Sequence, residues 1–453
     1  MTTAGLEFLS LHPFVRQGVV DRVRGAIVGG ALGDAIGLYT EFLTGEASRA
    51  AYPEGQFRLT SPVTELVNDG HRNKFTKGSW TDDTDHALLI ILSYLHHNGH
   101  QPAASDLALR LRFWCEQGLR CLDRMPMGLG QTVGRVVFDA DFLADPTATA
   151  YRHWAKGNYK AAPNGSLMRT APLGVLCIDK TAEETFATAA EFSAITHADP
   201  RCVVSCCLVS GLVRGILRGE VMDENDVDEF IEQSLEWAEA WVGRRRGESA
   251  GVEPDLDREE FCKNVRARGF EELRLDDMRV MGYVYKALGA GVLVLRLGMR
   301  CHPLRARYIP SAAQETRAGA GSANLFERLI STLILQGGDA DTNACVAASL
   351  LGALLGYSNL PPHWRDGMTH SAWLLEKCDV LCDVVRIFGG DPGYKGSSDP
   401  DTRVDGGKGV LTKEELDARD KAFMDVYMAR AQEKVRSESG KGKGWMGKVF
   451  GSI

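Results

Sequence analysis

Two short acidic stretches, each followed by an apolar run, constrain the fold of this chain more than any other feature. Residues 81–84 read Thr-Asp-Asp-Thr and precede the apolar run 87–95, and residues 339–342 read Asp-Ala-Asp-Thr and precede the run 344–356. An Asp or Thr at a helix start usually caps backbone N–H groups that lack partners. One cap residue suffices for that purpose. We therefore predict that the two stretches meet and form an all-oxygen site suited to a hard divalent cation.

The hydrophobic pattern favours helices throughout the chain. Of 453 residues, 44% are hydrophobic and 25% are charged, which is ordinary globular composition. Strand-type alternation is scarce, so we predict an all-α fold. We expect one large domain at 15–388, with a charged helical insertion at 221–277 in which the Arg run 244–246 forms a solvated face. Residues 389–453 read as a linker, a charged helix ending near 436, and a Gly/Lys tail.

Charge and cysteine usage exclude some classes of protein. The net charge of −8 argues against direct nucleic-acid binding. We see no apolar run of the roughly 18–20 residues that span a membrane, and no secretory signal at the N-terminus. The 11 cysteines form no CxxC pair or framework spacing, which favours a reducing compartment. We expect an intracellular, cytoplasmic monomer without a membrane partner, and a nuclear location is not excluded.

Glycines recur every fourth residue at 25, 29, 33 and 37, within a predicted helix over 20–40. Each Gly in a helix costs about 1 kcal/mol relative to Ala, so this stripe predicts a close backbone or ligand neighbour. The spacing does not match the dinucleotide-binding GxGxxG motif. Asp34 lies inside this helix and Glu41 follows two turns later. A buried Asp needs a partner, so Asp34 either supports a metal site or acts as a structural cap.

Three further stretches place polar residues just before helices, at 125–132, 161–173 and 195–201. Ordinary turn chemistry explains each of them. The first also suits a phosphate at a helix start. His197 in the third stretch is, by residue type and place, a satisfied core histidine unless a ligand lies nearby.

Taken in order, these stretches resemble the ADP-ribosylglycohydrolase family, the DraG-like dinuclear-metal hydrolases. The matching motifs are GxxxGGAxGDAxG at 25–37, Glu41, WTDDT at 80–84, NGSLMR at 164–169, THADP at 196–200 and GGDADTN at 337–343. The resemblance implies a compact orthogonal helical bundle with a dinuclear metal cleft. It also implies cleavage of the bond between the anomeric carbon of ADP-ribose and an acceptor. The implied cofactors are two divalent cations, with Mg²⁺ expected first and Mn²⁺ as the alternative.

The resemblance also implies roles for individual residues. The implied metal ligands are Thr81, Asp82, Asp83, Asp339, Asp341 and Thr342. Four carboxylates balance two dications, and without metal they raise one another's pKa. The implied catalytic residues are Glu41, as acid/base or water-orienting group, Asp82 and Asp341, with Asp34 supporting the ligands from behind. The implied substrate-binding residues are Gly128, Gly130, Gln131, Asn164, Gly165, Ser166 and His197.

The implied function is release of ADP-ribose from an ADP-ribosylated protein or a small ADP-ribosyl conjugate. The segment 161–163 (Ala-Ala-Pro) lacks the Gly-Ser-Tyr type sequence of serine-acting relatives. NGSLMR and THADP are more similar to the bacterial-type branch, so the acceptor stays open. One alternative is a catalytically silent ADP-ribose-binding or structural relative. Another is hydrolysis of a different ribosyl conjugate, since a fold does not fix its chemistry.

Overall fold

The protein is all-α, as predicted. The computed structural model describes residues 5–100, 103–248, 253–301 and 324–449. Within these ranges it contains helices and isolated β-bridges but no sheet. The α-helices are α1 (Pro13–Gly37), α2 (Gly45–Ala51), α3 (Asp82–His96), α4 (Ala104–Gln117), α5 (Gln131–Val137), α6 (Pro146–Lys156), α7 (Ala171–Leu176), α8 (Ala182–Ala194), α9 (Pro200–Arg218), α10 (Glu224–Glu248), α11 (Arg258–Val265), α12 (Phe270–Leu273), α13 (Val284–Cys301), α14 (Leu325–Ile334), α15 (Ala340–Leu355), α16 (Pro362–Arg365), α17 (Ser371–Val384) and α18 (Lys413–Val449).

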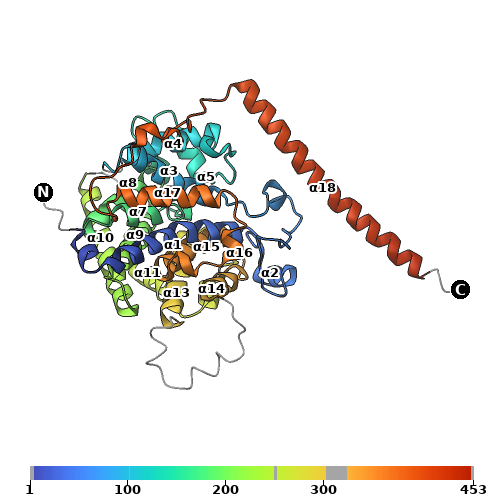
Figure 1. Ribbon diagram of the computed structural model, residues 1–453, viewed down its shortest axis with the longest axis horizontal. Coiled ribbons are helices and arrows are strands. Elements are labelled where there is room, and N and C mark those ends of the chain that lie inside the picture. Colours follow the sequence, from blue (N-terminus) through green and yellow to red (C-terminus); the bar gives the residue numbers. More distant parts are fainter. Residues whose placement is uncertain (1–4, 101–102, 249–252, 302–323, 450–453) are drawn as a thin grey trace, which may run out of the picture.

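Helices α1 and α15 run antiparallel through the centre of the body, side by side (Figure 1). The glycine stripe of α1 faces α15. A Cβ atom added at Gly25, Gly29 or Gly33 would collide with backbone carbonyl groups of α15 that are themselves spaced four residues apart. The predicted close neighbour is therefore the α15 backbone. The stripe ends at Gly37, where an added Cβ would collide with the Cα of Asp341.

Helix α9 lies in the interior with α7, α8, α10, α13 and α15 against it. It is long and apolar enough to cross a membrane by length and composition, although no such run stood out in the sequence. However, 94% of its apolar window is buried inside the protein. Among the described residues it is the one helix that meets this criterion, and its burial marks it as a core helix.

The predicted insertion contributes α10, α11 and α12, and its residues 249–252 lie outside the described ranges. Helix α10 is not only a surface element, because its apolar stripe joins the core against α9. The prediction of a solvated Arg run is wrong for Arg245. Its guanidinium stacks 4.2 Å from the Trp241 ring centroid and forms a 2.7 Å ion pair with the buried Glu253 carboxylate.

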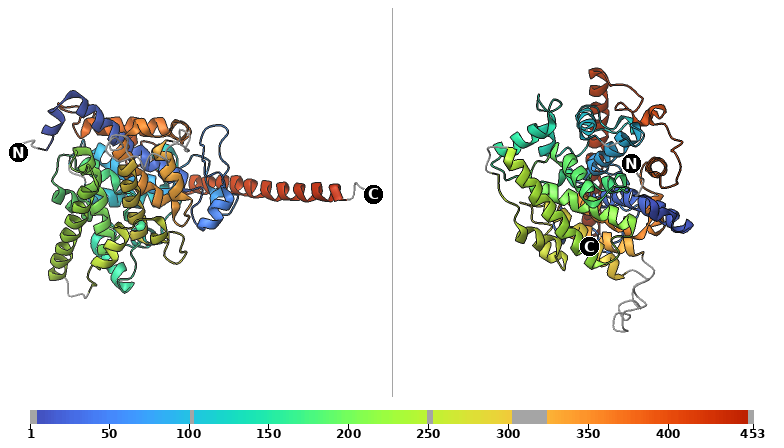
Figure 2. Two further views of the ribbon diagram at one scale, coloured as in Figure 1. Left: turned by 90° about the horizontal axis from the view of Figure 1, so that it is seen from below. Right: turned by 90° about the vertical axis from the view of Figure 1, so that its left-hand side faces the viewer.

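The C-terminal helix α18 projects away from the body (Figures 1 and 2). It continues to Val449, past the predicted end near 436, because the Gly/Lys stretch contains no proline to stop it. Residues 450–453 of the predicted tail lie outside the described ranges.

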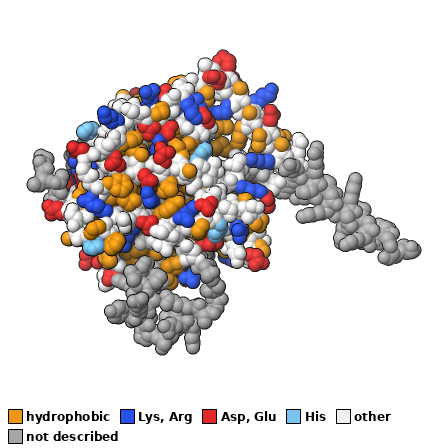
Figure 3. Space-filling model, viewed as in Figure 1, with side chains coloured by type: hydrophobic (Ala, Val, Ile, Leu, Met, Phe, Trp, Pro, Cys, Tyr) orange, Lys and Arg blue, Asp and Glu red, His pale blue; other side chains and the backbone are white. Residues whose placement is uncertain are grey.

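On the face of the body in Figure 3, acidic and basic side chains are interspersed. The division of the chain at residue 389 stays a prediction.

Candidate active site

An open cleft of about 580 Å³ collects most of the predicted site residues. Those that line it are Glu41, Thr81, Asp82, Asp83, Gly128, Gly130, Gln131, Asn164, Gly165, His197, Asp339, Asp341 and Thr342. Two predicted residues do not line it. Ser166 is buried behind the wall, where its hydroxyl accepts a hydrogen bond from Ser193. Asp34 lies beneath the floor.

Asp34 joins α1 to the first turn of α3. Its buried carboxylate accepts hydrogen bonds from the Thr81 N–H at 2.8 Å, the Thr84 N–H at 3.0 Å and the Thr84 hydroxyl at 2.6 Å. Burial raises the pKa of Asp34 to about 6, and these hydrogen bonds oppose the rise. Asp34 therefore fixes the start of α3, where Asp82 and Asp83 begin the helix.

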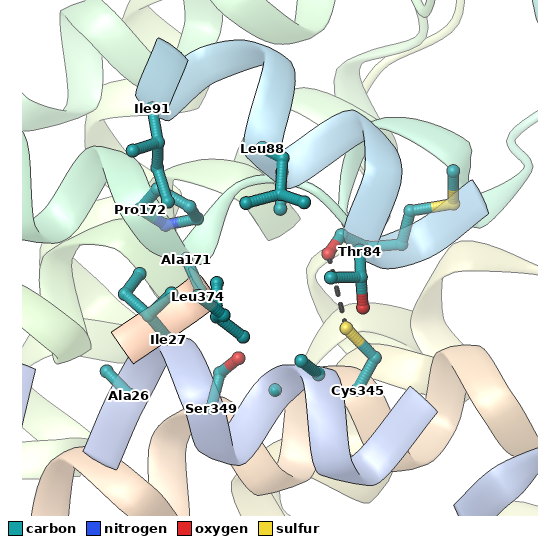
Figure 4. A pocket seen from close by; sticks show the side chains of 14 residues that line it. Ala26, Ile27, Thr84, Leu88, Ile91, Ala171, Pro172, Cys345, Ser349 and Leu374 are labelled. Atoms are coloured by element: carbon teal, nitrogen blue, oxygen red, sulfur yellow. Dashed lines mark hydrogen bonds between the residues drawn. The ribbon is translucent and has the colours of Figure 1, made fainter. Parts of the chain in front are cut away.

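The space behind this helix start is apolar. Figure 4 shows side chains of α1, α3, α7 and α15 around a small pocket of about 20 Å³ behind Thr84, among them Ile27, Leu88 and Pro172. The Cys345 thiol in the same pocket donates to the Met168 carbonyl at 3.5 Å. The rear of the acidic cluster is therefore lined mainly by apolar side chains, whereas its carboxylates line the cleft in front.

The two acidic stretches meet across the cleft floor. The Thr81 hydroxyl donates to Asp341 at 3.4 Å, and the Thr342 hydroxyl donates to Asp83 at 3.2 Å. One oxygen each of Asp83 and Asp341 is buried without a hydrogen-bond partner among the described residues. Burial first, and neighbouring carboxylates second, raise the pKa of both groups well above the usual range. Buried carboxylate oxygens without partners, beside one cleft, are a donor set that fits a hard divalent cation.

Glu41 belongs to the same cluster. Single carboxylate oxygens of Glu41, Asp339 and Asp341 lie within 4.8 Å of one another, close enough to share a metal ion. The turn at 337–338 brings Glu41 close to Asp339. The Phe42 N–H donates to the Gly338 carbonyl, and the Gly338 N–H donates to the Leu43 carbonyl. Both glycines have positive φ, +73° and +76°, which favours Gly at these positions. The sequence assigned Glu41 only to acid/base work, whereas the geometry also makes it a candidate ligand.

His71 lines the cleft but was not predicted from the sequence. Its Nε2 atom lies 2.6 Å from the Glu41 carboxylate, on the cleft wall beside Phe75 and Lys74. His71 follows a loop-like polar stretch with no motif, so no local pattern pointed to it. The loop from 68 to 75, which we call the cleft loop, forms this wall.

Another part of the cleft lining comes from the loops before α5 and α7. Gly128 has a φ of +91°, and a Cβ added there would collide with the Asp82 carboxylate. The Asn164 side-chain amide donates to Asp339 at 2.8 Å. These two loops therefore touch the acidic cluster directly, as well as lining the cleft.

His197 presents a neutral imidazole to the cleft. Burial, and secondly the nearby Arg169 guanidinium, lower its pKa to about 3. Arg169 donates to the Thr196 hydroxyl oxygen at 2.7 Å, and that hydroxyl lies 2.8 Å from His197 Nδ1. This arrangement favours the tautomer in which Nδ1 accepts and Nε2 carries the proton. Nε2 has no partner among the described residues and lies beside Gly165, so it is available to donate to a ligand oxygen.

The model of the family described as ADP-ribosylglycohydrolase matches residues 16–391. The chain belongs to the ADP-ribosylglycohydrolase family. This confirms the resemblance drawn from the motifs, and the family segment contains every residue of the cleft described above.

Proteins that match this chain in sequence are distant relatives. This chain is 25% identical over 354 residues to an ADP-ribosylarginine hydrolase Tri1 of Serratia proteamaculans, and the match covers 77% of this chain and 75% of the relative. It is 24% identical over 372 residues to the Tri1 protein of Pseudomonas putida, covering 80% and 78%. A solved structure described as an ADP-ribosylglycohydrolase-related protein complex aligns with a TM-score of 0.48 at 21% identity, over 82% of this chain and 99% of that chain.

Proposed function

We propose that this protein is a metal-dependent hydrolase that cleaves the bond between the anomeric carbon of ADP-ribose and an acceptor, releasing ADP-ribose. The observation that carries the proposal is the meeting of two acidic stretches, about 260 residues apart in sequence, in one open cleft of a family member. A purely structural role gives no reason for buried carboxylate oxygens without partners.

The proposed cofactors are two divalent cations, Mg²⁺ first and Mn²⁺ as the alternative. The residues that would hold them are Thr81, Asp82, Asp83, Asp339, Asp341 and Thr342, joined by Glu41. Bound there, divalent cations supply Lewis-acid polarisation and a template for ribose hydroxyls and a water molecule. The Asn164 amide and the Thr81 and Thr342 hydroxyls orient the carboxylates that such ions need.

The side chains of this protein supply the remaining functions. Glu41, with His71 against it, is the group placed to accept a proton from a water molecule in the cleft or to orient it. His197 Nε2 donates to an oxygen of the ligand, and the loops at 128–131 and 164–165 line the path of the diphosphate and distal ribose. The neutral state of His197 keeps it a hydrogen-bond donor without adding a fixed positive charge.

The acceptor is the open part of the proposal. The Tri1 relatives are named ADP-ribosylarginine hydrolases, so ADP-ribosylated arginine is the first acceptor to test, followed by serine, polymer and small ADP-ribosyl conjugates. The second candidate is a catalytically silent ADP-ribose-binding relative. The retention of all six proposed ligands in one cleft argues against it. The monomeric state and an intracellular location stay predictions.

The test is an acceptor panel with the wild type and with Asp341→Asn, each with added Mg²⁺ or Mn²⁺ and with EDTA. Asp341→Asn removes one anionic ligand from the cleft floor and is expected to lower turnover at least about 100-fold, because metal affinity and charge stabilisation both depend on it. Asp255→Asn, at an 87% exposed carboxylate, is the matched control. Fully active Asp341→Asn, or a wild type that releases no ADP-ribose from any acceptor, contradicts the proposal. ADP-ribose binding without turnover, measured by calorimetry, supports the silent alternative.

A further inference from the structure

The cleft loop is held firmly on its inner side. Arg72 is buried, and its guanidinium donates to the carbonyls of Tyr39 and Glu41 while pairing with Asp69. The Asp69 carboxylate also accepts the N–H groups of His71 at 3.0 Å and Arg72 at 2.7 Å. The loop and the segment that carries Glu41 are therefore joined by buried hydrogen bonds, and a displacement of one displaces the other.

Helix α18 holds the same loop on its outer side. The Arg430 guanidinium donates to the carbonyl of Asn73 at 3.0 Å and to that of Phe75 at 2.7 Å. The Asn68 amide donates to the Arg430 carbonyl at 3.4 Å. Tyr427 lies over the loop, with its hydroxyl 3.5 Å from the position of a Cβ on Gly70. One turn of α18 thus contacts the loop at its beginning, middle and end.

The contact face of α18 is encoded in its sequence. Over residues 413–432 of this helix, most side chains are exposed, and the partly buried positions Leu416, Arg419, Phe423, Tyr427 and Arg430 recur three or four residues apart, with Ala431 beside the last of them. This spacing places them on one stripe that faces the body. In Figures 1 and 2 the helix passes the segment that precedes α3 before it projects outward. The family segment ends at 391, so α18 is an addition to the region that this chain shares with the family.

We propose that α18 is a strap that fixes the cleft loop, and that Arg430 is a positioning residue that keeps His71 against Glu41. The assignment of a catalytic consequence rests on the proposed hydrolase function. A guanidinium that donates to two carbonyls on either side of Lys74 restrains the half of the loop that supplies Lys74 and Phe75 to the cleft wall. His71 lies two residues before Asn73, so its distance from Glu41 depends on the same restraint.

The test compares Arg430→Ala and Arg430→Lys with Arg419→Ala in the full chain. Arg419 is a matched control, because it lies on the same stripe and donates to a backbone carbonyl, that of Gln117 at 2.7 Å, outside the cleft loop. The first readout is amide hydrogen exchange over 68–75, which needs no activity. We expect exchange there to be about tenfold faster in Arg430→Ala, partly restored in Arg430→Lys, and unchanged in Arg419→Ala.

The second readout is the kinetics of ADP-ribose release. We expect Arg430→Ala to lower kcat about tenfold with KM within about twofold, since the proposed ligand contacts come from His197 and the loops at 128–131 and 164–165, whereas the cleft loop positions Glu41. Arg430→Lys recovers part of kcat, and Arg419→Ala leaves both constants unchanged. In a Glu41→Gln background, Arg430→Ala causes no further loss, because the group that it positions is already removed.

Three results separate the possible failures. Unchanged exchange over 68–75 in Arg430→Ala overturns the strap. Faster exchange with unchanged kcat overturns the positioning role of Arg430. A wild type that is inactive on every acceptor overturns the proposed function instead, and the exchange difference between Arg430→Ala and Arg419→Ala then decides the strap by itself.

Discussion

Raising the pH while divalent cations are chelated is expected to destabilise this protein. Burial raises the pKa of Asp34 from 3.8 to about 6, and raises those of Asp82, Asp83 and Asp341 well above the usual range. In the unfolded chain the same groups titrate near 3.9. Between these pKa values the folded protein binds more protons than the unfolded chain, so stability falls as pH rises. For Asp34 the loss begins near pH 4 and is complete above about pH 6.

The size of the effect follows from the pKa of Asp34. A rise from 3.8 to about 6 is roughly two pH units, which is on the order of 3 kcal/mol at about 1.4 kcal/mol per unit. An unfolding entropy of about 2.1 cal/mol/K per residue gives about 1 kcal/mol/K for 453 residues. Asp34 alone thus lowers Tm by about 3 °C, and the other buried carboxylates extend the loss to higher pH. A cation at about 100 times its Kd restores about 2.7 kcal/mol.

Thermal melts followed by circular dichroism at about pH 5, 6, 7 and 8, in EDTA and in Mg²⁺ or Mn²⁺, measure this dependence. We expect Tm in EDTA to fall with pH and the gain from added cation to be larger at about pH 8 than at about pH 5, because the ligands must lose their protons to bind. Asp34→Asn is expected to reduce the slope in EDTA, while Asp255→Asn leaves it unchanged. A Tm in EDTA that rises across this range, or an equal cation effect at both ends, refutes the reasoning.

Two glycine positions give further predictions, each with an internal control. Gly128→Ala is expected to weaken Mn²⁺ binding about tenfold in calorimetric titration, because an added Cβ at φ +91° collides with the Asp82 carboxylate. Gly130→Ala is the control: a Cβ there meets nothing within 4 Å, so Mn²⁺ affinity is expected to stay unchanged. Gly33→Ala is expected to lower the free energy of unfolding in urea by about 1–3 kcal/mol through collision with the Ala344 carbonyl. Gly18→Ala, on the same helix with nothing within 4 Å, is expected to raise it by up to about 1 kcal/mol. A stabilised Gly33→Ala, or Gly128→Ala with wild-type affinity, contradicts the close packing at these two glycines.

The features that sequence could predict are those written into local patterns. The all-α class followed from helical period and the lack of alternation, and the close neighbour of α1 followed from four glycines on one stripe. The meeting of residues 81–84 with 339–342 was predictable because two apolar helices that begin with carboxylates need a common charge partner. The last two inferences rest on a free-energy cost, that of glycine in a helix and that of a buried carboxylate, which an isolated helix cannot offset.

The features that were missed depend on contacts between segments that carry no pattern. Glu41 reaches Asp339 because backbone groups of Phe42 and Leu43 pair with the turn at Gly338. His71 reaches Glu41 because a polar loop folds back over it. Arg245 stacks on Trp241 although an Arg run usually faces solvent. The first two contacts leave no period or spacing in the sequence. Trp241 and Arg245 stand four residues apart on one helix, so that spacing could have indicated their contact.

The glycine stripe and the acidic cluster are parts of a single arrangement. Because α1 and α15 touch backbone to backbone, Gly37 lies against Asp341 at the start of α15. Asp34, one turn earlier on α1, binds the start of α3 and so sets where Asp83 lies. Any side chain that separates α1 from α15 therefore moves Asp341 relative to Asp83. Packing defects along the stripe should weaken cation binding as well as the fold, and defects nearest Gly37 should weaken cation binding most.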